Sequence, residues 1–280
     1  MTTDTDYGQG DNRQGGVGRN IDVDVATQEL RRRRRTWIGE AWDSNVGKKI
    51  AVALTGIVLV GYVVLHMIGN LTALLGAGEA ASGGAQIDEY GHWLREFGTP
   101  LLPAETFLWA VRVFLLASLV VHVVGVYQLT MRNRAARPAG FPARRIGRSW
   151  SARTMRLTGP LLLAFIVFHI LHFTVLAVDV TPLAHGEIYS NIHGAFQKWY
   201  FVVLYVAAVA ALGYHLRHGV WSLFQTLGID TPARNAYLRH GATALTVFVV
   251  VGFWMVPISF ATGALPEPVT GPNAPTEVSK

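Results

Sequence analysis

Four histidines lie deep inside four long apolar stretches of this chain. His66, His122, His169 and His215 each stand well away from the charged ends of their stretch. Imidazole is costly in hydrocarbon, so an intramembrane histidine marks a functional site by default. A hydrogen bond to a neighbouring helix would explain one such residue. Four of them call for a shared explanation, and imidazole is the commonest side-chain ligand of metals in proteins.

The elements that carry these histidines are predicted to span a membrane. The chain is 51% apolar and 15% charged, and its charges cluster between the apolar runs, which is typical of a polytopic membrane protein. A span needs about 20 residues to cross roughly 30 Å of hydrocarbon. We therefore expect an all-α bundle of five membrane-spanning helices, at about 50–75, 105–131, 157–178, 199–222 and 241–262. Residues 37–264 would form this membrane anchor, and residues 1–36 and 265–280 are predicted to be disordered tails.

Basic residues indicate the orientation of the bundle. The loop 132–156 carries eight arginines and no acid, and Arg31–Arg35 precede the first span. The loops at 76–104 and 179–198 are acidic or sparse in charge. Because Lys and Arg are enriched in cytoplasmic loops, the N-terminus is predicted to be cytoplasmic. The same asymmetry accounts for the net charge of +6. We therefore expect the lipid bilayer as a partner and no nucleic acid.

The predicted topology places the four histidines at two depths. At about 1.5 Å per residue, His66 and His169 lie about 24 and 20 Å from the inner edge. His122 and His215 lie about 25 Å from the outer edge, because their spans run the other way. Each depth thus holds one imidazole from each of two helices, the arrangement that ligates a haem iron from both sides. Depth alone does not separate His169 from His172, which also lies about 24 Å from the inner edge.

The absence of cysteine narrows the metal chemistry. With no Cys, the chain cannot form a thiolate zinc site or hold an iron–sulfur cluster by itself. The pairs His169 with His172 and His215 with His218 could still ligate a cluster whose thiolates come from a partner chain. His218 also lies near the inner headgroups, where neighbouring arginines suit haem propionates or a partner protein.

Five segments of the sequence resemble one protein family. They are GKKIAVALTG at 47–56, HMIGNL at 66–71, RNRAARP at 132–138, TGPLLLAFIVFHILHFT at 158–174 and HLRHGVWSLFQTLG at 215–228. Together they resemble the single-chain membrane anchor of succinate dehydrogenase or fumarate reductase, and within that family the b558-type cytochrome b subunit of bacteria. The resemblance covers about residues 45–262 and leaves both tails outside.

This resemblance implies a fold, cofactors and partners. Such anchors are five-helix bundles that hold two b haems and carry electrons between flavoprotein and iron–sulfur subunits on the cytoplasmic face and a membrane quinone, here expected to be menaquinone. The implied axial ligands of the haem irons are His66 with His169 for the outer haem and His122 with His215 for the inner haem, with His172 and His218 as secondary candidates. The resemblance also implies a bacterial plasma-membrane protein without a dicarboxylate site of its own. It leaves open whether the complex oxidises succinate or reduces fumarate.

The quinone pocket is the least defined of these expectations. Near the inner face, its candidate residues are Trp42, Ser44, His218, Trp221 and Ser222. Near the outer haem, an acidic loop residue such as Glu105 could exchange protons with the quinone.

Two other functions remain open on the sequence alone. One is a cytochrome b anchor of another oxidoreductase, such as a hydrogenase or formate dehydrogenase, which would differ in the subunits that co-purify with it. The other is a transporter whose intramembrane histidines relay protons or bind a metal ion. A transporter would be colourless, and the few acidic residues within the spans speak against it.

Overall fold

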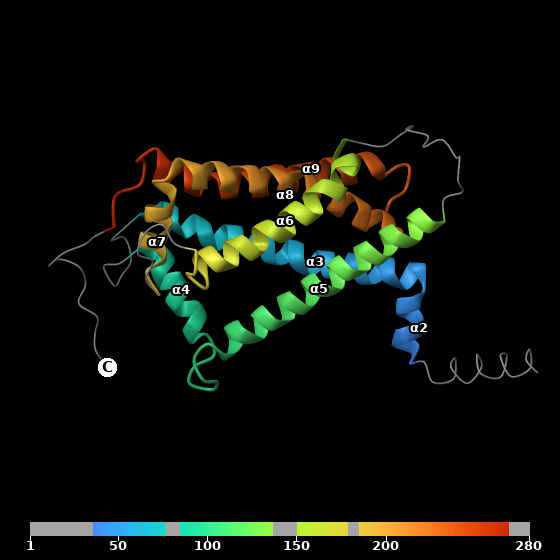
Figure 1. The fold of residues 1–280 in the computed structure, drawn as a ribbon, viewed down its shortest axis with the longest axis horizontal. Coiled ribbons are helices and arrows are strands. Elements are labelled where there is room, and N and C mark those ends of the chain that lie inside the picture. The colour runs from blue at the N-terminus through green and yellow to red at the C-terminus, as the bar shows by residue number, and fades with distance from the viewer. Residues whose placement is uncertain (1–35, 77–84, 137–149, 179–184, 269–280) are drawn as a thin grey trace, which may run out of the picture. The chain divides into compact units, whose positions relative to one another are not determined.

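The computed structural model describes residues 36–76, 85–136, 150–178 and 185–268, and the regular elements within these ranges are helices (Figure 1). They are α2 (Trp37–Asp43), α3 (Asn45–Leu71), the 3₁₀ helix η1 (Thr72–Leu75), α4 (Gln86–Glu96), α5 (Thr106–Ala135), α6 (Trp150–Phe173), α7 (Ile188–Phe196), α8 (Trp199–Thr226) and α9 (Asn235–Ala261). Five segments are long and apolar enough to cross a membrane: Asn45–Leu75, Thr106–Ala135, Thr154–Phe173, Trp199–Thr226 and Asn235–Ala261. The predicted all-α class with five membrane-spanning helices is confirmed. The predicted tails lie almost wholly outside the described residues, as does 137–149 of the arginine-rich loop.

The chain divides into two units, residues 1–48 and 49–280. In the first unit, α2 begins at Thr36, whose hydroxyl accepts a hydrogen bond from a backbone N–H three residues on, as N-cap residues do. α2 ends at Ser44, whose hydroxyl accepts from the Gly47 N–H at 2.8 Å. The Lys48 ammonium lies 4.9 Å from the centre of the Trp42 ring and donates to the Trp42 carbonyl. The side chains of Trp42 and Ser44 therefore both make contacts within this turn.

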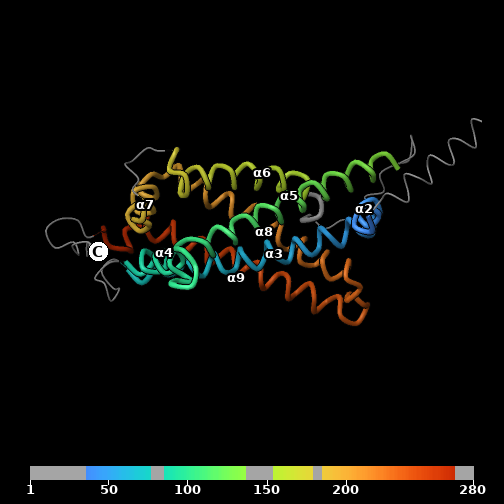
Figure 2. The backbone as a smooth tube through the Cα atoms, turned by 90° about the horizontal axis from the view of Figure 1, so that it is seen from below, coloured from blue at the N-terminus to red at the C-terminus, as the bar shows by residue number. Residues whose placement is uncertain are grey.

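In the second unit, α8 packs along both α6 and α9, and Figures 1 and 2 show α8 and α9 running side by side. Buried apolar side chains form two clusters, one including Tyr189, Phe196, Phe201 and Phe260, the other including Met67, Leu216, Val220 and Val249. α3 joins the second cluster through Met67, which is fully buried. Lipid chains are as apolar as leucine, so these clusters hold the helices together through close packing.

Two short helices, α4 and α7, lie in segments that the sequence predicted as loops. Both lie at the same end of the second unit and contact each other (Figures 1 and 2). The Asp88 carboxylate of α4 accepts a hydrogen bond of 3.0 Å from the Tyr189 N–H of α7. The Tyr189 hydroxyl donates to the Pro266 carbonyl at 2.8 Å. After the predicted orientation, we call this the outer end, and the end with the α8–α9 turn the inner end.

The long helices differ from the predicted spans at their ends. α6 ends at Phe173 rather than 178, and Leu176 beyond it has a left-handed backbone with φ of 57°. α8 continues to Thr226 and α9 already begins at Asn235. Hydropathy marks only the apolar part of a helix, whereas backbone hydrogen bonding continues into the polar turns at headgroup level.

Candidate haem site

The structure brings the outer pair together. The rings of His66 on α3 and His169 on α6 have centroids 5.8 Å apart, with planes at 73°. Two imidazoles on opposite sides of one metal ion, with metal–nitrogen bonds of about 2 Å, place their ring centres roughly 6 Å apart. Tyr62 stacks on His66 at 5.4 Å, and Phe253 of α9 lies 5.8 Å from the same ring. The separation of His66 and His169 thus fits one shared metal ion.

His172, the neighbour that depth could not separate from His169, has different surroundings. Its side chain is 2% exposed. Its ring stacks on Phe173 at 4.1 Å and lies 4.6 Å from Phe201. His169, in contrast, has its ring next to that of His66. This geometry favours His169 over His172 as the axial ligand.

At the inner depth, His122 of α5 is held by α3. Its Nδ1 lies 3.2 Å from the Val52 carbonyl oxygen and 3.3 Å from the Thr55 hydroxyl. A carbonyl only accepts, so Nδ1 carries the proton. The Thr55 hydroxyl donates its own proton to the Ala51 carbonyl at 2.8 Å and is therefore also an acceptor for His122. The Nε2 lone pair of His122 is left for a metal.

His215 of α8 is held by α6 in the same way. Its Nδ1 lies 3.4 Å from the Thr158 hydroxyl. That hydroxyl donates to the Thr154 carbonyl at 3.2 Å, so it accepts from the His215 Nδ1–H, and Nε2 again keeps its lone pair. Among the described residues, His122 and His215 make no ring contact with each other.

A glycine next to each threonine faces the same histidine. A Cβ at Gly56 would lie 3.6 Å from His122 Cε1, and one at Gly159 would lie 3.8 Å from His215 Cε1. Each inner imidazole therefore packs on a Thr–Gly pair of the neighbouring helix, with no side chain between ring and backbone.

Sequence reasoning missed these threonines, although a signal was present. The tripeptide Leu-Thr-Gly occurs at 54–56 and again at 157–159. His66 follows Thr55 by 11 residues, and His169 follows Thr158 by the same interval. Eleven residues are close to three helical turns, so the two side chains share a face. α3 and α6 therefore each present one outer histidine and one acceptor for an inner histidine.

Other candidate residues gather at the inner end of α8 and α9. His218 Nδ1 and Trp221 Nε1 are buried and, within the described residues, have no hydrogen-bond partner. Their rings lie 6.1 Å apart, and the Arg239 guanidinium lies 5.4 Å from the Trp221 ring. An unsatisfied buried donor costs about 1–3 kcal/mol, so this place suits an oxygen-bearing ligand. Ser222 follows Trp221 on α8, whereas Trp42 and Ser44 belong to the first unit.

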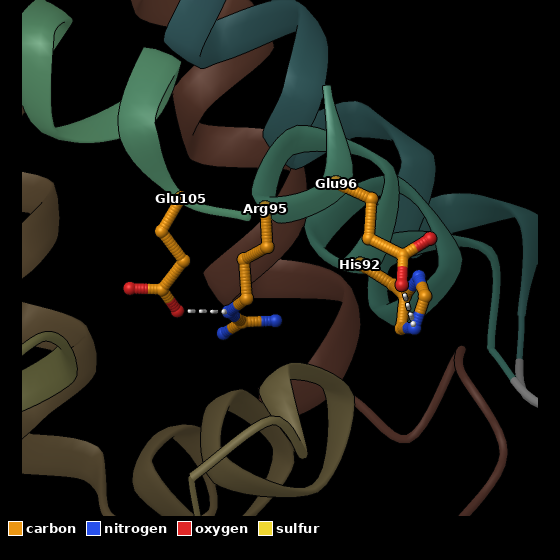
Figure 3. Close-up of polar contacts among 4 residues, drawn as sticks. All are labelled: His92, Arg95, Glu96 and Glu105. Atoms are coloured by element: carbon orange, nitrogen blue, oxygen red, sulfur yellow. Dashed lines mark ion pairs between the residues drawn. The ribbon is translucent and has the colours of Figure 1, made fainter. Parts of the chain in front are cut away.

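The outer carboxyl groups differ in their surroundings. Glu105 lies 4.0 Å from the Arg95 guanidinium, and both side chains are partly exposed (Figure 3). The nearby exposed pair His92 and Glu96 is 3.5 Å apart. Asp88 is half-buried, and burial raises the pKa of its carboxyl above the usual range, against the opposing hydrogen bonds from the backbone of Tyr189 and its neighbour. Asp88 is thus suited to hold a proton above the pH at which an ordinary carboxyl group ionises.

The described residues offer few protein donors for a bare metal ion. In the described part of the chain, no three His, Asp or Glu side chains converge as ligands for a metal ion. Two imidazoles alone leave most coordination positions of an iron to other donors, which a porphyrin supplies.

Comparison with known proteins agrees with this geometry. Residues 132–254 match the family model described as the succinate dehydrogenase/fumarate reductase transmembrane subunit. The match includes His169 and His215 together with Thr158. No curated protein and no solved structure matches the chain. The family match confirms the resemblance predicted from the sequence, and the chain is a multi-pass membrane protein similar to the transmembrane subunit of succinate dehydrogenase and fumarate reductase.

Proposed function

We propose that this chain is the cytochrome b anchor of a succinate:quinone oxidoreductase or fumarate reductase, with two bis-histidine b haems. The observation that carries the proposal is the matched contact of Nδ1 of each inner histidine with a threonine hydroxyl of a neighbouring helix. His122 and His215 each use Nδ1–H on an acceptor of a neighbouring helix, which leaves Nε2 as a metal ligand. A histidine that served only to join two helices would have no need for the same Nδ1 contact to be repeated at a second histidine.

The residues of the chain would bind and orient the two haems. Bound haem iron would supply one-electron exchange between an iron–sulfur partner and a quinone. His66 and His169 hold the outer position, and His122 and His215 hold the inner one. Thr55 and Thr158 would accept from the Nδ1–H of the inner imidazoles and so hold the rings with Nε2 pointing away from the neighbouring helix.

The same chain would offer two places for quinone chemistry. At the inner end, the Trp221 indole and His218 could donate to a carbonyl oxygen, since both have buried nitrogen atoms without a described partner. At the outer end, Asp88 could take up or release the proton that accompanies quinone turnover, since burial raises its pKa. The expected substrate is menaquinone.

The remaining parts of the proposal concern partners and place. Flavoprotein and iron–sulfur subunits would dock on the cytoplasmic side, where the basic residues at 132–156 and 217–239 are expected to lie. The chain would sit in a bacterial plasma membrane. It would carry electrons without binding the dicarboxylate itself.

The test is a haem count on the purified membrane complex. A reduced-minus-oxidised spectrum with a pyridine haemochrome assay should give two b haems per chain. His122→Ala or His215→Ala should each remove the inner haem, and His66→Ala or His169→Ala the outer one. His92→Ala, on an exposed position of α4, is the matched control and should retain both.

Other results would overturn the proposal in distinguishable ways. A colourless wild-type protein would refute haem binding. In that case, an iron–sulfur signal in electron paramagnetic resonance would indicate a cluster shared with a partner, and no signal would favour a transporter. Two haems together with hydrogenase or formate dehydrogenase subunits would refute only the identity of the partner.

A further inference from the structure

One tyrosine hydroxyl lies between two histidines at the outer depth. Tyr205 Oη of α8 is 3.3 Å from His169 Nδ1 and 3.0 Å from His172 Nδ1. His169 and His172 are one turn apart on α6, so the hydroxyl contacts the same ring nitrogen of both. The expected axial ligand and its rival are therefore joined through one group.

A tyrosine hydroxyl has one proton, and this limits the arrangement. If Tyr205 donates to His172, then it can only accept at His169, whose Nδ1 must carry a proton. The Nε2 of His169 then has a lone pair, and the Nε2 of neutral His172 carries a proton. The reverse arrangement gives His172 the lone pair. With both hydrogen bonds formed and both rings neutral, only one of the two histidines can ligate a metal through Nε2.

The surroundings of His169 select between the two arrangements. His169 is the one whose ring lies 5.8 Å from His66. Ligation through His169 requires that its Nδ1–H donates to Tyr205 and that Tyr205 donates to His172. The hydrogen-bond chain then runs in one direction, from His169 through Tyr205 to His172.

The position of Tyr205 is firmly held. Its side chain is 8% exposed, and its ring makes edge contacts with Phe165 at 5.1 Å and Phe196 at 5.2 Å. A buried ring held by aromatic neighbours keeps its hydroxyl in place, so the contact to both histidines does not depend on a mobile side chain.

We propose that Tyr205 is a positioning residue of the outer haem, which assigns the axial role to His169 and sets the electron density on that ligand. The inference rests on the proposed function. A hydrogen bond donated by Nδ1–H makes the imidazole a more basic ligand, and a more basic ligand favours the ferric state. Tyr205 would thereby lower the reduction potential of the outer haem.

The first test is Tyr205→Phe, which keeps the packed ring and removes only the hydroxyl. Potentiometric titration of the complex should show the outer haem easier to reduce, with its ferric-to-ferrous ratio at fixed potential shifted by about tenfold, or ~59 mV for one electron. The inner haem should not change. Tyr200→Phe is the matched control, because Tyr200 is an exposed tyrosine of the same helix, α8, and it should leave the outer potential close to that of the wild type.

A second variant tests which histidine is the ligand. His172→Leu should retain both haems, because His172 accepts from Tyr205 and does not ligate the iron. The reduction potential of the outer haem should rise less in this variant than in Tyr205→Phe. The Tyr205 hydroxyl still accepts from His169, but it no longer donates to His172 and is therefore a weaker acceptor. His172→Gln, which offers an amide oxygen as acceptor, should restore the wild-type potential.

The outcomes separate this inference from the proposed function. Two haems in the wild type with an unchanged or lowered outer potential in Tyr205→Phe would refute the role of Tyr205 alone. Loss of the outer haem in His172→Leu would refute the direction of the chain and assign the axial role to His172. A wild-type protein without haem would refute the proposed function itself.

Discussion

The hydroxyl groups of Thr55 and Thr158 each contact one ring nitrogen, Nδ1, of an inner histidine. The number of hydrogen-bond acceptors at that nitrogen differs between His122 and His215. His122 Nδ1 has both the Val52 carbonyl and Thr55, whereas the acceptor described for His215 Nδ1 is Thr158. Removing the hydroxyl should therefore matter more at His215. The side chain of valine has nearly the same shape as that of threonine, so the comparison isolates the hydrogen bond.

We expect Thr158→Val to weaken retention of the inner haem by about 10- to 100-fold, as other losses of such partners do. Thr55→Val should weaken it less, because the Val52 carbonyl remains. The measurement is the rate at which the inner haem is lost from the purified complex. Thr158→Ser should restore retention, and an equal effect of the two valine variants would contradict this account.

At Asp88, the chemistry is governed by burial. Burial raises the folded-state pKa of its carboxyl, so the folded protein is more stable while Asp88 is protonated. This stability is fully present below the unfolded pKa and is lost as the pH rises through the folded pKa. Asp88→Asn keeps an oxygen that can accept from Tyr189 N–H but cannot ionise.

Thermal unfolding in detergent should therefore depend less on pH in Asp88→Asn than in the wild type across the acidic range. The variant should be the more stable protein at neutral pH. A wild-type profile that becomes more stable as pH rises through this range would contradict the raised pKa.

At the scale of elements, glycine decides how closely α3 and α9 approach. A Cβ added at Gly252 of α9 would lie 2.8 Å from Met67 Cγ of α3, and Met67 is fully buried. Gly61 of α3 has no neighbouring atom within 4 Å of such a Cβ. Two glycines in long membrane helices thus differ only in what lies opposite them.

We expect Gly252→Ala to destabilise the bundle by about 1–3 kcal/mol, the usual cost of overpacking a buried contact. Gly61→Ala should be neutral or stabilising by up to about 1 kcal/mol, because alanine is the better helix former. Reversible unfolding of the purified protein in detergent measures both. A destabilisation of similar size in the two variants would show that helix packing at Gly252 is not responsible.

At the scale of the whole molecule, the orientation in the membrane is predicted from charge. The predicted cytoplasmic N-terminus depends on the arginine-rich segment at 132–156. Because the chain has no cysteine, single cysteines can report which side each loop faces. Ala135 at the end of α5 and the exposed Glu187 before α7 are suitable positions.

We expect Ala135→Cys to react with an impermeant thiol reagent only in inside-out vesicles or opened cells. Glu187→Cys should react in intact cells, since its segment is predicted to face outward. The cysteine-free parent is the control for background labelling. The opposite pattern would invert the topology and place the docking surface on the other side of the membrane.

The histidines, their depths and the five spans could be predicted from the sequence because each depends on local composition. Apolar runs long enough to cross a bilayer identify the helices, and helical rise converts position into depth. The resemblance added the pairing of His66 with His169 and of His122 with His215. Even the Thr55 and Thr158 acceptors have a signal in the repeated Leu-Thr-Gly, which becomes informative once the helices are placed next to one another.

Other features required the tertiary structure, because they depend on which atoms of distant segments meet. α4 and α7 are short and lie within polar segments, and what distinguishes them is their contact through Asp88 and Tyr189. The sequence indicated Glu105 as one example of an outer carboxyl group. The raised pKa of Asp88 depends on burial, which composition does not reveal. His169 and His172 are equivalent by spacing and depth. The Tyr205 hydroxyl of another helix has one proton, so it allows only one of the two histidines to ligate a metal through Nε2.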